Sequence, residues 1–167
     1  MGRLTPEEFA QAGKTPMVLI LDNIRSMHNV GSMFRTADCF LAEHIYLCGM
    51  TPEPGHHEIE KTALGATQTV AWTKVDDTLS CIQSLKEQGF RIAALEQAED
   101  SIDLRNYQVQ GPTALVVGHE VMGVQQAVVD ACDDVIEIKQ FGTKHSLNVS
   151  VSAGMALFEI HKGLTVK

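Results

Sequence analysis

The sequence lacks several features that would each define a class of protein. No apolar run approaches the ~20 residues that a membrane-spanning helix needs. The stretch from Met1 to Glu8 contains no hydrophobic signal region, so we expect a protein that is not secreted. The cysteines lie far apart and without the spacing of metal ligands, which predicts reduced, mostly buried thiols and a cytoplasmic location. These cysteines are Cys39, Cys48, Cys81 and Cys132.

Common nucleotide and metal motifs are also absent. No Gly-x-Gly-x-x-Gly follows the first expected strand, which argues against a dinucleotide-binding protein, and there is no P-loop lysine. The residue four after His119 is Gly123, so this histidine does not begin a zinc-binding HExxH helix. The run from His56 to Glu60 contains metal-ligand types, but a surface at the start of a helix is a far commoner reading. We predict no metal site.

Positive charge is scarce. The chain has 21 acidic residues against 13 lysines and arginines, and its net charge of −8 argues against a protein that binds nucleic acid through an overall basic face. The acidic residues crowd into expected helix surfaces and turns, whereas cations lie in glycine-bearing segments. The sequence therefore leaves open a local basic cleft on an acidic body. These cations are Arg25, His28, Arg35, Lys61, Lys139, Lys144 and His145.

Strand-like and helix-like segments alternate along the 167 residues, a length that suits one domain with a substantial core. Short apolar runs predict strands, and apolar residues at helical spacing predict helices between them. We expect an α/β fold with a mainly parallel sheet flanked by helices, and Asn29 as the N-cap of the first of these helices. The expected strands are 17–21, 44–48, 69–72, 90–95, 113–117 and 135–138, and the expected helices are 30–40, 59–65, 76–88, 124–132 and 147–161.

Three polar, glycine-bearing segments follow expected strands, where parallel sheets bind their ligands. The first contains Arg35 among apolar neighbours, which indicates either a functional guanidinium or an ion pair with Asp38 or Asp22. In the second, a buried strand runs into Gly118 and then Glu120. This pattern is typical of close backbone approach to a ligand, although a plain strand-turn-helix connection would look the same.

The third segment, 135–154, places a polar run before the last helix. Ser146 or Asn148 can cap that helix, and unpaired N–H groups at a helix start can also hold a ligand or a phosphate. Ile138, Phe141 and Leu147 can provide an apolar slot for a flat heterocycle. The segment therefore predicts either an ordinary capped helix or part of a binding site.

Together the three segments resemble the SpoU/TrmH family of RNA ribose 2′-O-methyltransferases, which belongs to the SPOUT superfamily. Asn29–Asp38, Gly118–Gly123 and Ser146–Val151 are similar to its three motifs in the family's order, and Lys61–Ala66 resembles a further common stretch. The resemblance implies a C-terminal deep trefoil knot of SPOUT type, a homodimer, and transfer of a methyl group from S-adenosyl-L-methionine to a ribose 2′-hydroxyl of tRNA or rRNA. It also implies a single methyltransferase domain over 1–167 with no separate RNA-binding domain.

The resemblance further implies roles for particular residues. The cofactor-binding positions are Leu95, Gly118, Ile138 and Leu147, and the catalytic positions are Arg35, Asn29, Glu120, Ser146 and Asn148. Because a guanidinium stays protonated, we favour Arg35 as a group that positions a phosphate and stabilises negative charge over one that removes a proton. Where the family usually has proline and an apolar residue, this chain has Lys139-Gln140 and so lacks proline's fixed φ.

Other functions are compatible with parts of the pattern. A non-catalytic RNA-binding or assembly protein could share the fold, although the retained polar residues of the motifs favour activity. A flavodoxin-like protein would bind a flavin without these motifs. A base methyltransferase with a cysteine nucleophile is disfavoured, because no cysteine falls in the three candidate ligand segments.

Overall fold

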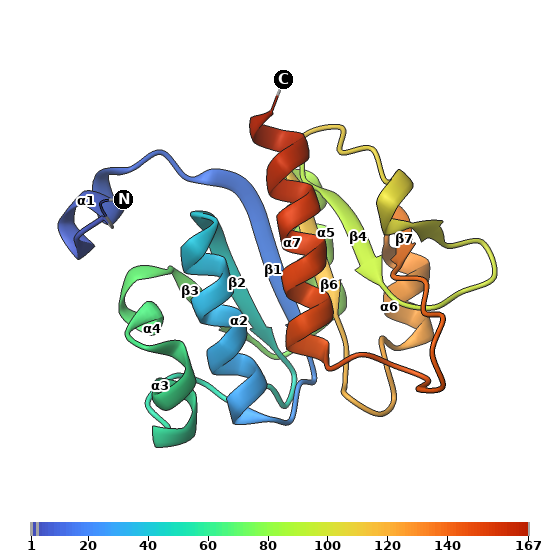
Figure 1. The fold of residues 1–167 in the computed structure, drawn as a ribbon, viewed down its shortest axis with the longest axis horizontal. Helices are drawn as coiled ribbons and strands as arrows, with labels where there is room; N and C mark the ends of the chain where they lie inside the picture. The colour runs from blue at the N-terminus through green and yellow to red at the C-terminus, as the bar shows by residue number, and fades with distance from the viewer. Residues whose placement is uncertain (1, 3, 167) are drawn as a thin grey trace.

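One parallel sheet forms the centre of the protein, in a computed structural model that describes residues 2 and 4–166. The sheet has seven strands in the order β3-β2-β1-β6-β4-β7-β5, and every pairing is parallel (Figure 1). The expected α/β fold with a parallel sheet is therefore confirmed. The strands are β1 (Thr15–Asp22), β2 (Ala42–Cys48), β3 (Trp72–Val75), β4 (Arg91–Leu95), β5 (Ile102–Asp103), β6 (Thr113–Val117) and β7 (Asp134–Glu137).

Helices cover both faces of the sheet. Alternate residues of β1 point to opposite faces, so that Leu19 packs beneath α2 and α7 while Ile20 packs beneath α5 and α6. Burial on both faces explains why this strand is an uninterrupted apolar run. The helices are α1 (Pro6–Gln11), α2 (Met27–Cys39), α3 (His57–Ala63), α4 (Ala66–Thr69), α5 (Thr78–Glu87), α6 (Gln126–Ala131) and α7 (Val149–Thr165), with a 3₁₀ turn, η1, at Leu104–Asn106.

Two local predictions are wrong. Helix α2 begins at Met27 rather than after Asn29, because the side chain of Ser26 caps it and accepts a hydrogen bond from the backbone N–H of Asn29 at 3.3 Å. The expected strand 69–72 is instead the end of α4 followed by β3. Two left-handed residues, Leu64 and Gly65, turn the backbone between α3 and α4, and pairing with β2 starts only at Trp72.

Several helix ends lie a few residues from the expected positions, and the largest difference is at the end of α7. Asn148, one of the two expected caps, precedes α7, which continues to Thr165 instead of ending at His161. Helix α1 was not predicted, although Thr5 and Glu8 form a capping box there, with a glutamate three positions after a threonine. Strand β5 and η1 were not predicted either, because they are too short to show periodicity.

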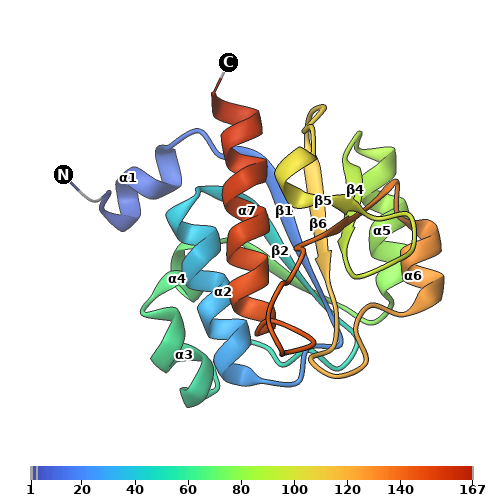
Figure 2. The ribbon, with the colours of Figure 1, turned by 45° about the vertical axis from the view of Figure 1, so that its right-hand side comes forward.

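A long connection between β7 and α7 carries the chain back toward the middle of the sheet before the last helix. It leaves β7, which lies beyond β4 in the sheet, and returns to α7, which packs on β1 and β6. Figure 2 shows this connection on the same side of the sheet as the segment between β4 and β6. The C-terminal trefoil knot that the resemblance implies would form at this connection, and it stays a prediction. No helix of the described residues combines the length and the apolar character needed to span a bilayer.

Helices α2 and α3 approach each other most closely at Gly31. A Cβ atom at this position would collide with the hydroxyl of Thr62 and the carbonyl oxygen of Ile59. Gly31 is buried, so neither helix can relax freely away from the other. The glycine therefore fixes how closely α3 lies against α2.

We expect Gly31→Ala to lower the free energy of unfolding by about 1–3 kcal/mol, the usual effect of overpacking a close contact. Urea denaturation followed by circular dichroism measures the change. Gly13→Ala is the matched control, because a Cβ atom at Gly13 meets no heavy atom within 4 Å. Equal stability of the two variants would contradict the close contact of α2 with α3.

Candidate active site

The buried side chain of Asn29 connects the three segments that follow strands. Its Nδ2 donates a hydrogen bond to Oε1 of Glu120 at 3.1 Å, and its Oδ1 accepts one from Nδ2 of Asn148 at 3.1 Å. The side chain is therefore satisfied by one partner after β6 and one at the start of α7. Only 8% of Asn29 is exposed, so an unpaired amide here would be costly.

Glu120 holds the loop that leads into α2. Its carboxylate accepts hydrogen bonds from the backbone N–H groups of Arg25, at 3.0 Å, and Ser26, at 2.9 Å. Burial alone would raise the pKa of Glu120, but these backbone hydrogen bonds and the one from Asn29 outweigh it and lower the pKa below its usual value. Glu120 is thus an ionised group that orders the loop, and within the described residues it forms no hydrogen bond or ion pair with Arg35.

Asn148 both caps α7 and joins the network. Its Oδ1 accepts hydrogen bonds from the backbone N–H of Ser150 at 2.9 Å and from the Ser150 hydroxyl at 2.6 Å. The amide nitrogen is then left to donate to Asn29. The first turn of α7 is consequently oriented by the same contacts that connect the three segments.

The turn after β6 is tight. A Cβ atom at Gly118 would collide with the backbone of Gly123 and Val124, which explains the glycine there. Nδ1 of His119 accepts hydrogen bonds from the backbone N–H groups of Val121, at 3.1 Å, and Met122, at 3.2 Å. Gly118, expected to bind cofactor, therefore shapes this turn.

Glu96 is a residue that the sequence analysis missed. It follows β4, and its Oε2 accepts a hydrogen bond from the backbone N–H of Val124 at 2.8 Å. It thereby attaches the turn after β6 to the end of β4. A carboxylate directly after a buried strand is the signal that could have found it.

A small pocket of about 140 Å³ lies between the ends of β4 and β7 and the approach to α7. Three of the four expected cofactor positions, Leu95, Ile138 and Leu147, line it, and Gly118 is not among its lining residues. Ser146 also lines it, away from the hydrogen-bonded network of Asn29. An adjoining groove of about 600 Å³ shares Gln97, Glu137, Gln140 and His145 with the pocket and adds Lys139, Phe141 and Lys144.

The loop 138–147 beside this pocket is not held by hydrogen bonds to the rest of the described chain. None of its backbone or side-chain groups makes a hydrogen bond to another residue of the described chain. The loop is largely exposed, and Phe141 is 84% exposed. Its peptide groups are thus available to water or to a ligand. The absence of proline at Lys139-Gln140 leaves this backbone without a fixed φ at its start.

Arg35 lies in a different groove, of about 610 Å³, between α2, α3 and the start of α7. The side chain is exposed, and within residues 4–166 it forms no ion pair with Asp38, Asp22 or any other carboxylate. The structural ion pair considered from the sequence is therefore not formed. Ser150 lines this groove and Ser152 lines the small pocket, so the first turn of α7 separates the two cavities.

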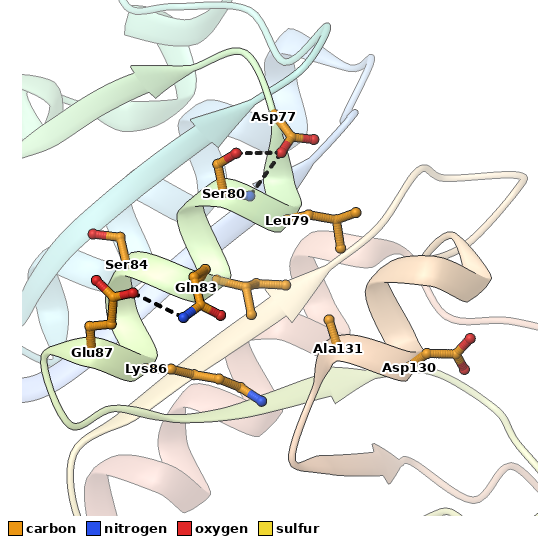
Figure 3. Close-up of a pocket in the computed structure, with 10 residues that line it drawn as sticks. Asp77, Leu79, Ser80, Gln83, Ser84, Lys86, Glu87, Asp130 and Ala131 are labelled. Carbon is orange, nitrogen blue, oxygen red and sulfur yellow. Dashed lines mark hydrogen bonds between the residues drawn. The ribbon is translucent and has the colours of Figure 1, made fainter.

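A further groove of about 680 Å³ lies on the opposite face of the sheet, between α5 and α6. Figure 3 shows its lining side chains, which include Asp77, Gln83, Lys86 and Asp130. It contains none of the residues singled out from the sequence. The face that carries α2 and α7 is therefore the one on which the candidate residues gather.

The remaining expectations concern cysteines and metals. All the cysteines are free, but only Cys48 and Cys81 are buried, while Cys39 is exposed and Cys132 is half-buried. The expectation of mostly buried thiols is thus met for half of them. Among the described residues, no group of three His, Cys, Asp or Glu side chains is arranged to hold a metal ion.

Fold and site define a parallel α/β protein with an asparagine-centred network at the carboxyl ends of its strands. The profile of the SpoU rRNA Methylase family matches residues 16–158, and the chain belongs to this family. It is 35% identical over 153 residues to the 23S rRNA (guanosine-2′-O-)-methyltransferase RlmB of Neisseria meningitidis, with 91% of this chain and 60% of that protein covered.

Solved structures agree with this assignment. The A. aeolicus TrmH/SpoU tRNA modifying enzyme superimposes with a TM-score of 0.83 at 29% identity, covering 95% of this chain and 79% of that one. An AdoMet-bound rRNA methyltransferase from Sinorhizobium meliloti superimposes with a TM-score of 0.84 at 27% identity, covering 95% of this chain and 60% of that one. The chain spans about 60% of the length of the RlmB relative.

The ionised state of Glu120 predicts a pH-dependent stability. The pKa of Glu120 is lower in the folded protein than in the unfolded chain, where a glutamate has a pKa of about 4.3. The carboxylate therefore stabilises the fold fully above the unfolded pKa. This stabilisation is lost as the pH falls through the pKa of Glu120 in the folded protein. We expect Glu120→Gln to cost about 1–3 kcal/mol at neutral pH, since an amide leaves a backbone donor without its acceptor. The variant should then lose less stability than wild type on acidification below about pH 5.

Urea denaturation at a series of pH values measures both effects. Glu43→Gln is the control, because Glu43 lies exposed on β2 and its side chain makes no hydrogen bond or ion pair with any other described residue. Identical acid profiles for wild type and Glu120→Gln would show that the carboxylate does not hold the loop in its ionised form.

Proposed function

We propose that the protein transfers a methyl group from S-adenosyl-L-methionine to a ribose 2′-hydroxyl of tRNA or rRNA. One observation carries this proposal: the Asn29 network joins the three family motifs beside a pocket lined by Leu95, Ile138 and Leu147. The family assignment and the AdoMet-bound relative support the same chemistry. The free cysteines agree with a cytoplasmic location for this activity.

The residues around the pocket fit the proposed cofactor. Leu95, Ile138 and Leu147 offer an apolar surface to an adenine ring, and the unpaired peptide groups of loop 138–147 can hydrogen-bond its edge. Glu137 contributes a carboxylate toward a positively charged ligand. The pocket alone is smaller than the 300–1,000 Å³ of typical ligand sites, so we assign the rest of the ligand to the adjoining groove.

The bound cofactor supplies an electrophilic methyl group on a sulfonium. The 2′-hydroxyl is a weak nucleophile, and negative charge would develop on its oxygen as it gives up its proton to water. The oxygen would then bond to the methyl carbon while the carbon–sulfur bond breaks and S-adenosyl-L-homocysteine leaves. Arg35 stays protonated and is exposed in its groove without a carboxylate partner among the described residues. We assign to it the positioning of the adjacent phosphate and the stabilisation of charge on the oxygen. Asn148 and Ser146 orient the ribose, and Glu120 orders the loop before α2.

A homodimer accounts for the separation of the two cavities. Arg35 and the cofactor pocket lie on opposite sides of the first turn of α7, so a second subunit can bring its own Arg35 to this pocket. Helix α7 offers an apolar surface for this contact, with Val151 53%, Met155 44% and Phe158 52% exposed along one side. Exposed apolar side chains gathered in this way are typical of protein interfaces.

We expect Arg35→Ala to retain cofactor binding but to lower methyl transfer at least about 100-fold, as loss of a charge-stabilising group does in other enzymes. Calorimetry with S-adenosyl-L-methionine measures binding, and transfer of tritium from the labelled cofactor to bulk RNA measures activity. Lys162→Ala is the control, since Lys162 pairs with Glu159 late in α7. Unchanged turnover of Arg35→Ala refutes the role, and RNA binding without any transfer by wild type favours the non-catalytic alternative.

We also expect the cofactor to order loop 138–147. Its backbone N–H groups have no protein acceptor among the described residues, so they should exchange with solvent rapidly in the free protein. Hydrogen–deuterium exchange should slow in this loop on addition of S-adenosyl-L-methionine, while exchange in α5, on the other face, stays the same. Unchanged exchange in 138–147 together with measurable binding would place the cofactor elsewhere.

A further inference from the structure

The groove that contains Arg35 carries a second cation. Lys61 of α3 lines it together with Arg35 of α2. The other lining residues are hydroxyl-bearing or small side chains and one aromatic ring: Ser32, Thr36, Cys39, Phe40, Thr62 and Ser150. Two cations, several hydroxyl groups and no carboxylate make a lining that suits an anion.

The other cavities differ from this one in charge. The α5–α6 groove, the small pocket, the groove that adjoins it, and a cavity between η1 and α7 that contains Glu159 each have at least one carboxylate in their lining, even where a lysine is also present. The α5–α6 groove contains Asp77, Glu87 and Asp130, and the groove beside the cofactor pocket contains Glu99 and Glu137. On a chain with net charge −8, the Arg35 groove therefore stands out as a locally cationic surface.

Lys61 has no competing partner in the described part of the chain. It makes no hydrogen bond or ion pair there, and its side chain is exposed. The nearby carboxylate of Glu58 is engaged by His28 and His57, which lower its pKa, and the charge of Lys61 adds only a smaller effect. The ammonium group is thus available to a ligand from solution.

The backbone fixes Lys61 next to Arg35. Gly31 allows α3 to pack directly on α2, and the Thr62 hydroxyl donates to the backbone carbonyl of His28 at 3.1 Å. Lys61 precedes Thr62 in α3, so the helix that carries it is held against the helix that carries Arg35. The two cations flank one groove because of this packing, and a ligand does not need to assemble them.

We propose that Lys61 binds a backbone phosphate of the substrate RNA in the Arg35 groove and so positions the strand for reaction at Arg35. The proposal deepens the proposed function and rests on it for the identity of RNA as the ligand. The ammonium group acts as a point charge on a phosphodiester and reads no base. Lys61 is therefore a positioning residue that contributes affinity for RNA of any sequence.

The test is the salt dependence of RNA binding, measured with unfractionated tRNA and no methyl donor. Loss of one phosphate contact lowers the slope of log affinity against log salt by about one. For Lys61→Gln, the ratio of wild-type to variant affinity should then fall about three- to fourfold between about 50 and 200 mM salt. Lys61→Arg should restore the wild-type slope, and Lys162→Gln should leave it unchanged.

In the transfer assay, Lys61→Gln should raise KM for RNA far more than it lowers kcat, and calorimetry should find unchanged affinity for S-adenosyl-L-methionine. Parallel salt plots for wild type and Lys61→Gln would overturn the proposal. RNA binding is measured without the methyl donor, so parallel salt plots would contradict the role of Lys61 alone. Failure of the proposed function would instead appear as wild-type protein that binds RNA or cofactor but transfers no methyl group.

An independent measurement uses the unaltered protein. Cys39 is an exposed thiol in the lining of the same groove, so iodoacetamide should modify it in the free protein. Bound tRNA should slow this modification at low salt and lose its effect at high salt, as mass spectrometry of the Cys39 peptide would show. Modification at the same rate with and without bound tRNA would show that the groove does not receive the RNA.

Discussion

The buried amide of Asn29 can satisfy its hydrogen-bonding groups only if three distant segments meet at one place. It donates to Glu120 after β6 and accepts from Asn148 at the start of α7, while Glu120 holds the loop before α2. A buried polar network that is fully satisfied specifies a single arrangement, whereas one missing partner leaves a costly unpaired group. The positions of the proposed cofactor pocket and of the Arg35 groove both depend on this requirement, because α7 separates them and Asn148 orients its first turn.

The division of the site into two cavities has a chemical consequence. Methyl transfer needs the donor carbon and the acceptor oxygen in contact, yet within one chain the pocket lined by Leu147 and the groove lined by Arg35 lie on opposite sides of α7. The proposed homodimer reconciles these facts, since it places the guanidinium of one subunit opposite the pocket of the other. The exposed apolar side chains of α7, including Phe158, would then be covered by the second subunit.

Sequence patterns predicted most of the sheet, because β1 and β6 are buried on both faces and are therefore continuously apolar. They failed where a tertiary contact decided the local structure. Asn29 has the side chain of a helix cap, but the helix begins earlier and its amide serves the network instead. The motifs identified which polar residues gather, while their partners could not be read from spacing: Glu120 contacts the backbone of Arg25 and Ser26, and Glu96 lies outside every motif.

The net negative charge of the chain affects how it can bind RNA. A body with net charge −8 repels a polyanion at long range, so non-specific association with RNA is weak and depends on salt. Under the proposed function, RNA binding must then come from the few places where cations are concentrated and carboxylates are absent. Arg35 and Lys61 flank such a groove, and Gly31 sets the packing of the helices that carry them. Global repulsion combined with local attraction favours an RNA that inserts its backbone into this groove over one that merely touches the surface, so the charge distribution itself contributes to selectivity.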